Sequence, residues 1–251
     1  MIIYTGPSML DGKPIVVIAT AGSRNAKTGP LIQTWILRAD MDPVEAGRCG
    51  ADSTVCGDCP HRHFSGGSCY VPIWQAVRSV WYAWFNGRYD GPAAEQKVRV
   101  AIAGGAGIRL GSYGDPAAVP VEAWDKLLGK SKMHTGYTHA WRRPEAQALR
   151  GLCMASCDTD EDCQEASAMG WRYFRVMSAG STPPPRSVQC LSDAKGKSCV
   201  ECGVCYGAKV DRDVQPTSIW IEVHGAMSKR FERTMELARG RRSPSLQMLR
   251  V

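Results

Sequence analysis

Eight of the eleven cysteines in this 251-residue chain lie in two compact groups. The first group is Cys49, Cys56, Cys59 and Cys69, and the second is Cys190, Cys199, Cys202 and Cys205. Thiolates bind zinc and iron–sulfur clusters, and four of them complete either kind of site. The cysteines therefore predict two four-thiolate metal sites.

The second group has the more specific spacing. Cys199, Cys202 and Cys205 repeat as C-x2-C-x2-C, and Cys190 upstream is the candidate fourth ligand. This triple is similar to the run with which bacterial ferredoxins bind a 4Fe-4S cluster. Structural zinc more often uses one C-x2-C pair and a second pair farther along the chain. The spacing favours an iron–sulfur cluster, with zinc as the alternative.

The first group is spaced C-x6-C-x2-C-x9-C and suits zinc or a second cluster equally well. His61 or His63 can replace a thiol in this group. The other three cysteines, Cys153, Cys157 and Cys163, we interpret as small buried residues rather than as a third site.

Disulfide bonds are the other common use of eight cysteines. The chain begins Met1-Ile2-Ile3-Tyr4, without the basic and apolar regions of a signal peptide. Disulfides persist in oxidising compartments, to which nothing directs this chain. We therefore expect free thiols and a cytoplasmic location.

Composition is that of a globular protein. Hydrophobic residues make up 44% of the chain, and no apolar run approaches the length of about eighteen residues that a membrane span needs. The net charge is +7, and basic residues become denser near the end of the chain, at Lys229, Arg230, Arg233, Arg239, Arg241 and Arg242. Nucleic acid or a nucleotide suits this charge as a partner, and a solvated helix end explains it equally well. The oligomeric state stays open.

Apolar periodicity predicts the secondary structure. Residues 14–20 and 31–38 form an expected N-terminal β-hairpin, and residues 71–86 an amphipathic helix. From residue 98 onward, short apolar strands alternate with helices. The expected strands are 98–103, 132–137, 152–156, 171–177 and 218–223, and the expected helices are 120–128, 144–150, 159–169 and 228–239.

This alternation favours an α/β fold with parallel strands. A complete (β/α) barrel takes about 250 residues, and the cysteine loops at 49–69 and 190–205 use part of the chain. We therefore expect an incomplete TIM-like barrel of about six units, with the hairpin at its N-terminus. It forms one domain over residues 1–240, followed by a basic tail at 241–251.

Parallel α/β folds place their chemistry at the carboxyl ends of the strands. The candidate catalytic residues expected there are Asp115, His134, Tyr137, His139, Arg175 and Glu222. Gly104, Gly105 and Gly107 would let a cofactor approach the backbone. A flexible loop in which Asp115 caps a helix before Pro116 and a buried polar network are the alternatives, and Asp158 we interpret as the cap of the helix that follows it.

The motifs around Cys56, Cys59 and Cys69-Tyr70, the glycine loop ending in Asp115, and the cysteine triple with Cys190 resemble those of a group of bacteriophage and plasmid cysteine-rich proteins. The resemblance covers about residues 20 to 225. It implies a phage origin, the host cytoplasm and iron–sulfur binding, and it brings no established reaction.

The same group looks distantly like radical S-adenosylmethionine barrel enzymes. Those enzymes leave one iron open with a C-x3-C-x2-C triad, which the first cysteine group lacks. With four thiols at each site, neither cluster needs an open iron. S-adenosylmethionine is therefore the weakest of the cofactor predictions.

Three hypotheses follow. The first is an iron–sulfur redox or radical-type enzyme that acts on a nucleotide or nucleic acid in a pocket flanked by the clusters. The second is a zinc-stabilised nucleic-acid-binding protein. The third is an enzyme similar to the transglycosylases that insert deazaguanine bases, with zinc on Cys199, Cys202, Cys205 and His224 and with Asp115 and Asp158 as carboxylates. The cysteine spacing ranks them in this order.

Overall fold

The computed structural model describes residues 1–64, 66–129, 131–208, 216–224 and 227–242. Its strands are β1 (Ile2–Pro7), β2 (Pro14–Thr20), β3 (Ile32–Arg38), β4 (Ile108–Tyr113), β5 (His134–Thr135), β6 (Tyr137–Thr138), β7 (Met154–Cys157), β8 (Tyr173–Met177), β9 (Ser187–Gln189) and β10 (Ser218–Glu222). Most of the expected basic tail, residues 243–251, lies outside the described residues.

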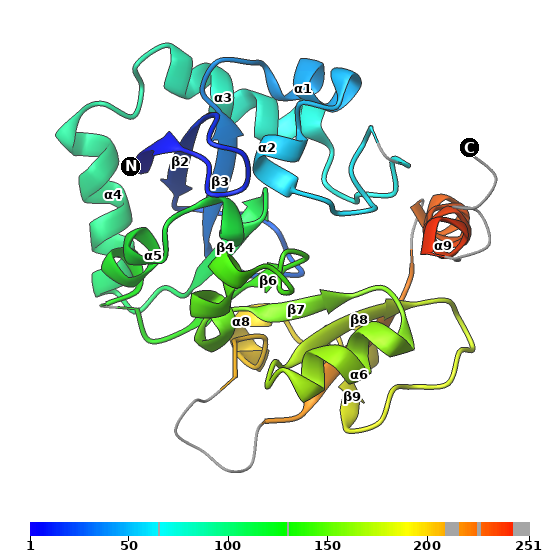
Figure 1. Ribbon diagram of the computed structural model, residues 1–251. Helices are drawn as coiled ribbons and strands as arrows, with labels where there is room; N and C mark the ends of the chain where they lie inside the picture. The colour runs from blue at the N-terminus through cyan, green and yellow to red at the C-terminus, as the bar shows by residue number, and fades with distance from the viewer. Residues whose placement is uncertain (65, 130, 209–215, 225–226, 243–251) are drawn as a thin grey trace.

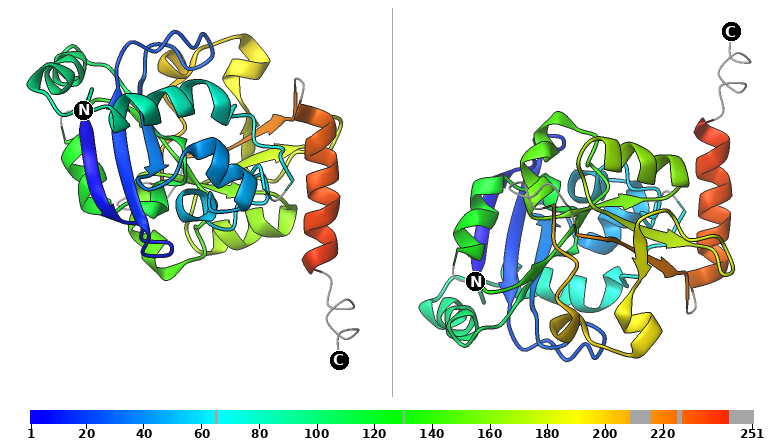
Figure 2. Two further views of the ribbon diagram at one scale, coloured as in Figure 1. Left: turned by 90° about the horizontal axis from the view of Figure 1, so that it is seen from above. Right: turned by 90° about the horizontal axis from the view of Figure 1, so that it is seen from below.

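The α-helices are α1 (Pro43–Cys49), α2 (Ser53–Cys56), α3 (Arg78–Phe85), α4 (Pro92–Ala103), α5 (Val121–Leu128), α6 (Asp160–Ala168), α7 (Leu191–Lys195), α8 (Cys199–Cys202) and α9 (Ser228–Arg242). One π-helical segment, η1 (Ile73–Val77), leads into α3, and two 3-10 segments are η2 (Pro116–Ala118) and η3 (Pro144–Gly151). Helix α9 lies at one edge of the molecule, away from β1 and β2 (Figure 2).

The described strands form two five-stranded sheets (Figure 1). The first has the order β1-β2-β3-β4-β5, in which β1, β2 and β3 pair antiparallel and β3, β4 and β5 pair parallel. The second has the order β6-β7-β8-β10-β9 and is parallel throughout. The α/β class, the β2–β3 hairpin and the parallel pairing are therefore confirmed.

The two sheets meet at Gly136, the single residue between β5 and β6. A Cβ atom at this position would lie 2.7 Å from the sulfur of Cys153 and 3.3 Å from the Cβ of Leu110. Only glycine leaves room for this close approach. The chain can thus pass from the first sheet into the second without a loop.

The core forms where β2 and β3 are covered on both faces. Ile15, Val16, Val17, Ile18 and Ala19 are all fully buried. This continuous apolar run explains why the strand was predictable, since a strand buried on both faces needs no polar alternation. The core fixes the position of β4, whose carboxyl end leads toward the candidate site.

The strand expected at residues 98–103 is wrong, because these residues belong to helix α4. Val98 and Ile102, four residues apart, are buried, whereas Val100 between them is 58% exposed. This is the spacing of one helix face. Pro92 occupies the first turn of the helix, as proline favours.

Strand β4 follows α4 and was not expected. Gly104, Gly105 and Gly107 therefore precede a strand and lie at its amino end. A cofactor-binding loop was expected at the carboxyl end of a strand, which is not where these glycines lie. Gly107 has a packing role instead, since a Cβ there would lie 2.8 Å from Leu31.

Gly114, directly after β4, is a position where we expect substitution to be costly. Its φ is +85°, and an added Cβ would lie 2.6 Å from the Cβ of Ile36. Gly114→Ala should lower the free energy of unfolding by about 3 kcal/mol, because backbone strain of about 1–2 kcal/mol adds to overpacking of about 1–3 kcal/mol. Urea unfolding measures the change.

Gly105→Ala is the matched control. Gly105 also has a positive φ, +88°, but nothing lies within 4 Å of an added Cβ. We expect only the backbone strain there, about 1–2 kcal/mol. Equal losses at the two positions would show that the close packing of Gly114 against Ile36 contributes nothing.

Candidate metal centres

The four cysteines of the second group lie together. Cys190 precedes α7, Cys199 and Cys202 begin and end α8, and Cys205 follows three residues later. Burial raises the pKa of Cys205 to about 12, and the nearby thiols of Cys190, Cys199 and Cys202 act in the same direction. The four thiols therefore lie near enough to one another to interact electrostatically.

Local signals explain how α8 forms. The side chain of Ser198 and that of Glu201 make a reciprocal capping box at the start of the helix. Gly203 ends it with a left-handed φ of +65°. This single turn of helix presents Cys199 and Cys202 to the same place.

Backbone hydrogen bonds attach the second group to both sheets. The amide of Cys199 donates to the carbonyl of Lys27 at 2.9 Å, in the loop between β2 and β3. The carbonyl of Cys205 accepts from Gly136 at 3.2 Å, and the amide of Cys190 donates to Trp220 of β10 at 2.8 Å. The candidate ligands thus lie in a segment that has few buried apolar residues. Three backbone hydrogen bonds attach this segment to the rest of the protein.

Arg172 fixes the chain after Cys205. It is buried, and its guanidinium donates to the carbonyls of Tyr206 at 2.6 Å, Thr217 at 2.7 Å and Pro216 at 3.1 Å. Each of its three nitrogens is used by backbone. Arg172 therefore acts as a structural clamp rather than as a phosphate-binding residue.

Arg109 of β4 lies between the two cysteine groups. It donates to the hydroxyl of Tyr70 at 2.7 Å and lies over the ring of Tyr137, 5.8 Å from its centroid. Tyr70 comes directly after Cys69, and the Tyr137 side chain hydrogen-bonds with Cys205. Arg109 was not expected to take part, because residues 104–116 were interpreted as a loop.

In the first group, only Cys56, Cys59 and Cys69 lie together. Burial and the thiols of Cys59 and Cys69 raise the pKa of Cys56, and burial raises that of Cys69 to about 11. Cys49 is exposed at the end of α1, with its sulfur 3.8 Å from the sulfur of Met41. It is not among the groups that act most strongly on Cys56 or Cys69. The structure thus presents three of the four expected ligands as a set.

His139 adjoins the three cysteines of the first group. Nε2 of His139 is 3.9 Å from the sulfur of Cys59 and 3.6 Å from Oδ1 of Asp158. Nε2 of His61 is 2.9 Å from the same carboxylate oxygen. Burial disfavours the charged imidazole of His139, but Cys59 and Asp158 outweigh it and raise its pKa. The pKa of Asp158 is lowered, because the two histidines outweigh the effect of burial.

The spacing of the thiols bears on the kind of metal centre. Among the described residues, His61, His139 and Asp158 are the only three that bring ligand atoms within 4.8 Å of one another. No three cysteine sulfurs of the described chain are that close. Tetrahedral zinc with bonds of about 2.3 Å would place its sulfurs about 3.8 Å apart. A cluster separates its thiolates more widely, because each binds a different iron.

Asp115 takes the capping role that was the alternative to a catalytic one, whereas Asp158 does not cap the helix after it. Asp115 accepts from the amide of Ala117 at 2.9 Å and from that of His139 at 2.7 Å, so it caps η2 and positions His139. Helix α6 is capped by Thr159 together with Asp162, not by Asp158. The interpretation of Asp158 as a cap is therefore wrong, and its carboxylate faces the two histidines. Asp158 directly follows β7, at the carboxyl end of a parallel strand, where the candidate catalytic residues were expected.

The remaining candidate residues lie in other places. His134 contacts the carbonyl of Leu152 at 3.0 Å, and burial lowers its pKa. Arg175 donates to the carbonyl of Val176 and lies 3.6 Å from Asp160 of α6.

Glu222 accepts from the amide of Gly180 at 3.0 Å. The ring nitrogens of His224 face Lys27 and the carbonyl of Glu222, both at 2.9 Å. Both ring nitrogens of His224 therefore have partners other than the thiols that the transglycosylase hypothesis assigns to it. His63 contacts the carbonyl of Val71 at 3.0 Å.

Cys153, Cys157 and Cys163 are buried in the main core, as expected. Burial raises the pKa of both Cys153 and Cys157. A neutral thiol in an apolar core packs like a small hydrophobic side chain. These three cysteines are therefore packing residues.

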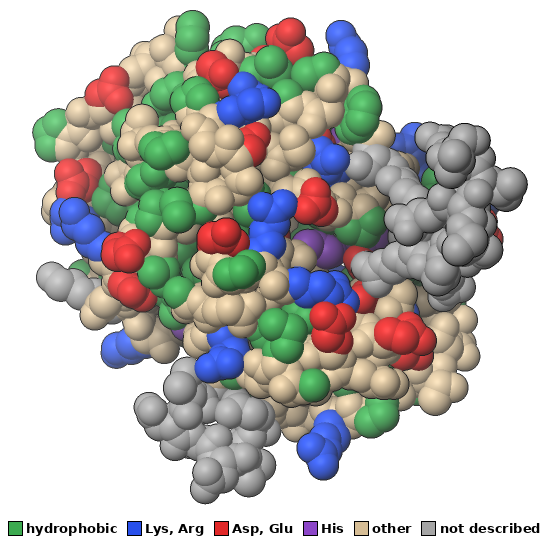
Figure 3. Space-filling view, viewed as in Figure 1, with side chains coloured by type: hydrophobic (Ala, Val, Ile, Leu, Met, Phe, Trp, Pro, Cys, Tyr) green, Lys and Arg blue, Asp and Glu red, His purple; other side chains and the backbone are tan. Residues whose placement is uncertain are grey.

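A pocket of about 180 Å³ adjoins the first group. His139 and Asp158 line it, together with Asp58, Pro60, Ala140, Trp141, Arg142, Arg143, Ser156 and Asp162. Figure 3 shows histidine side chains in a recess near the middle of this face, with acidic and basic side chains around them. Of the six candidate catalytic residues, His139 alone lines this pocket.

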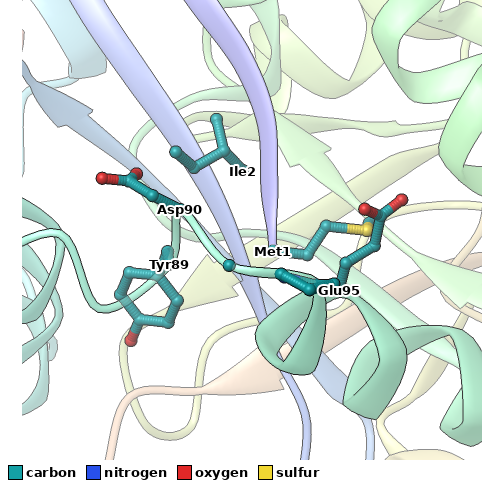
Figure 4. Close-up of a pocket in the computed structure, with 7 residues that line it drawn as sticks. Met1, Ile2, Tyr89, Asp90 and Glu95 are labelled. Carbon is teal, nitrogen blue, oxygen red and sulfur yellow. The ribbon is translucent and has the colours of Figure 1, made fainter.

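A larger pocket of about 520 Å³ lies at the N-terminus. Figure 4 shows Met1 and Glu95 together on one side of it and Tyr89 and Asp90 on the other, with Ile2 between them. None of the predicted site residues lines it. We place the candidate site at the smaller pocket, because His139 and Asp158 line it and converge with His61.

Comparisons of the chain with protein-family models, curated proteins and solved structures gave no match. Within the described residues, no helix combines the length and the apolar character needed to cross a membrane. Function is therefore inferred from the geometry of the two cysteine groups and the pocket beside the first.

Proposed function

We propose that this protein is an iron–sulfur enzyme, with a 4Fe-4S cluster held by Cys190, Cys199, Cys202 and Cys205. The carrying observation is that the four thiols of residues 190–205 lie near one another, yet no three described cysteine sulfurs lie within 4.8 Å of one another. That spacing suits a cluster better than one zinc ion. When bound, the cluster would supply one-electron chemistry.

Cys56, Cys59 and Cys69 of the first group are the proposed ligands of another metal centre. It adjoins the pocket lined by His139 and Asp158, which we propose as the reaction site. Asp115 orients His139 through its backbone amide. The incomplete barrel remains our interpretation of the two sheets joined at Gly136.

A nucleotide or nucleic-acid substrate also remains a proposal, supported by the net charge of +7. Arg142 and Arg143 line the pocket, but their guanidinium groups are paired with Asp162, Glu165 and Asp58. A phosphate would therefore have to compete with these carboxylates.

The test is analysis of protein purified without oxygen. A brown protein with about four irons and four sulfides for each occupied site supports the proposal. A colourless protein that carries zinc in stoichiometric amount contradicts it. If iron is present, incubation with a reductant and S-adenosylmethionine, followed by a search for 5′-deoxyadenosine, tests the radical-type alternative.

Metal binding at the second group should release protons. Burial raises the pKa of Cys199, and that of Cys205 to about 12, so these thiols are protonated at pH 7 without metal. Metal ions bind the thiolate form. Affinity for zinc, used as a probe of the apoprotein, should therefore rise with pH, by about tenfold per pH unit for each proton released.

Calorimetric titrations in two buffers of different ionisation enthalpy would count these protons. Release of fewer than about one proton per zinc ion at pH 7 would show that the apoprotein thiols are already ionised.

A further inference from the structure

We propose that His61, His139 and Asp158 bind one divalent transition-metal ion of the Fe²⁺ to Zn²⁺ series at the edge of the 180 Å³ pocket. This site would be additional to the two cysteine centres. It does not rest on the iron–sulfur proposal, since none of its ligands is a thiol.

Convergence of the three side chains is the first observation. Both Nε2 atoms face Oδ1 of Asp158, from His61 at 2.9 Å and from His139 at 3.6 Å. All three ligand atoms lie within 4.8 Å of one another. Two imidazoles and one carboxylate are the ligand set of many non-haem Fe²⁺ sites and of some catalytic zinc sites. Three protein ligands leave coordination positions for a substrate.

Outer contacts hold each ligand in place. Nδ1 of His61 lies 2.7 Å from the hydroxyl of Ser68, and the His61 ring stacks on Phe231 of α9 at 5.4 Å. A hydrogen bond on the other ring nitrogen is the usual support of a metal-binding histidine. It fixes the ring so that Nε2 faces Asp158.

The other two ligands are fixed through their backbone. The amide of His139 donates to Asp115 at 2.7 Å, and the amide of Asp158 donates to Asp162 at 2.9 Å. These residues follow β6 and β7, two parallel neighbours whose carboxyl ends meet. The ligands are thus positioned by the sheet and not only by each other.

The pocket gives the ion access to small molecules. His139 and Asp158 line it, and their side chains are 24% and 8% exposed. Its volume of about 180 Å³ is below the range of about 300–1,000 Å³ for drug-sized ligands. A small polar molecule, or one end of a longer one, would therefore reach the ion.

Two histidines that share a carboxylate can also form a hydrogen-bonded cluster without metal. Calorimetric titration with Co²⁺ of the anaerobically purified protein, with its cysteine centres still occupied, separates the two cases. We expect one site that is lost in Asp158→Asn and weakened more than 100-fold in His61→Gln. Ser68→Ala, which removes only the outer contact, should weaken it by about tenfold.

His63→Gln is the matched control, because His63 lies in the same loop but contacts the carbonyl of Val71. It should bind Co²⁺ like the wild type. Unchanged binding in Asp158→Asn, or no binding by the wild type, would overturn the proposal. Should a variant fail to fold, X-ray absorption of the wild-type cobalt complex decides. Nitrogen and oxygen neighbours support the site, and sulfur from Cys59 overturns it.

Discussion

Cys199→Ser should lose the iron and sulfide of the second centre, about four of each per chain. Cys199 begins α8 and lies among the other three thiols of the group. Serine preserves the size of the side chain and the start of the helix, but a hydroxyl is a poor ligand for iron. Iron and sulfide analysis after anaerobic purification measures the loss, and circular dichroism checks that the fold is retained.

Cys49→Ser is the matched control. Cys49 was predicted as a ligand of the first group, but its exposed thiol lies beside Met41 and Ala46. We expect its replacement to leave both iron and sulfide unchanged. Full iron content in Cys199→Ser would refute a cluster at the second cysteine group. Loss of iron in Cys49→Ser would show that Cys49 is a ligand at the first group.

Arg172→Leu should destabilise the protein by about 3 kcal/mol or more. The substitution leaves the carbonyls of Tyr206, Pro216 and Thr217 without their donors. Each buried group that loses its partner costs about 1–3 kcal/mol, more where the partner was charged. Burial of a leucine returns part of this loss. Urea unfolding of the apoprotein measures the difference.

The same substitution should weaken the second centre, because Tyr206 follows Cys205 directly. Arg99→Ala is the control. Arg99 forms an exposed ion pair with Glu95 on α4, a kind of contact that contributes little. If Arg172→Leu unfolds no more easily than Arg99→Ala, the three carbonyl contacts are not a clamp.

Much of the fold was predictable where the signal was local. Strand β2 matches its expected range of residues 14–20, and helix α5 (Val121–Leu128) lies within the expected 120–128. Both carry the apolar spacing of their own secondary structure. Helix α4 was misread, because Val98 to Ala103 is a short apolar run that suits a strand or a helix equally well.

Where the strands were predicted correctly, residues of the candidate site do lie at their carboxyl ends. His139 follows β6 and Asp158 follows β7, and the two meet as neighbours of parallel strands. The glycine loop does not lie at such a strand end, because it precedes β4. Arg175 and Glu222 lie on expected strands, yet their partners are Asp160 and Gly180 outside the pocket.

The sequence by itself determined the four thiols of the second group, because their spacing within one short segment leaves little freedom in how they gather. Only the tertiary structure decided the membership of the first group. Cys49 lies close in sequence to Cys56, but α1 and its glycine cap turn it away. The second sheet brings two distant residues to the first group. His139 lies 80 residues beyond Cys59, and Asp158 lies 97 residues beyond His61. Such long-range contacts depend on how strands pair, which residue spacing does not encode.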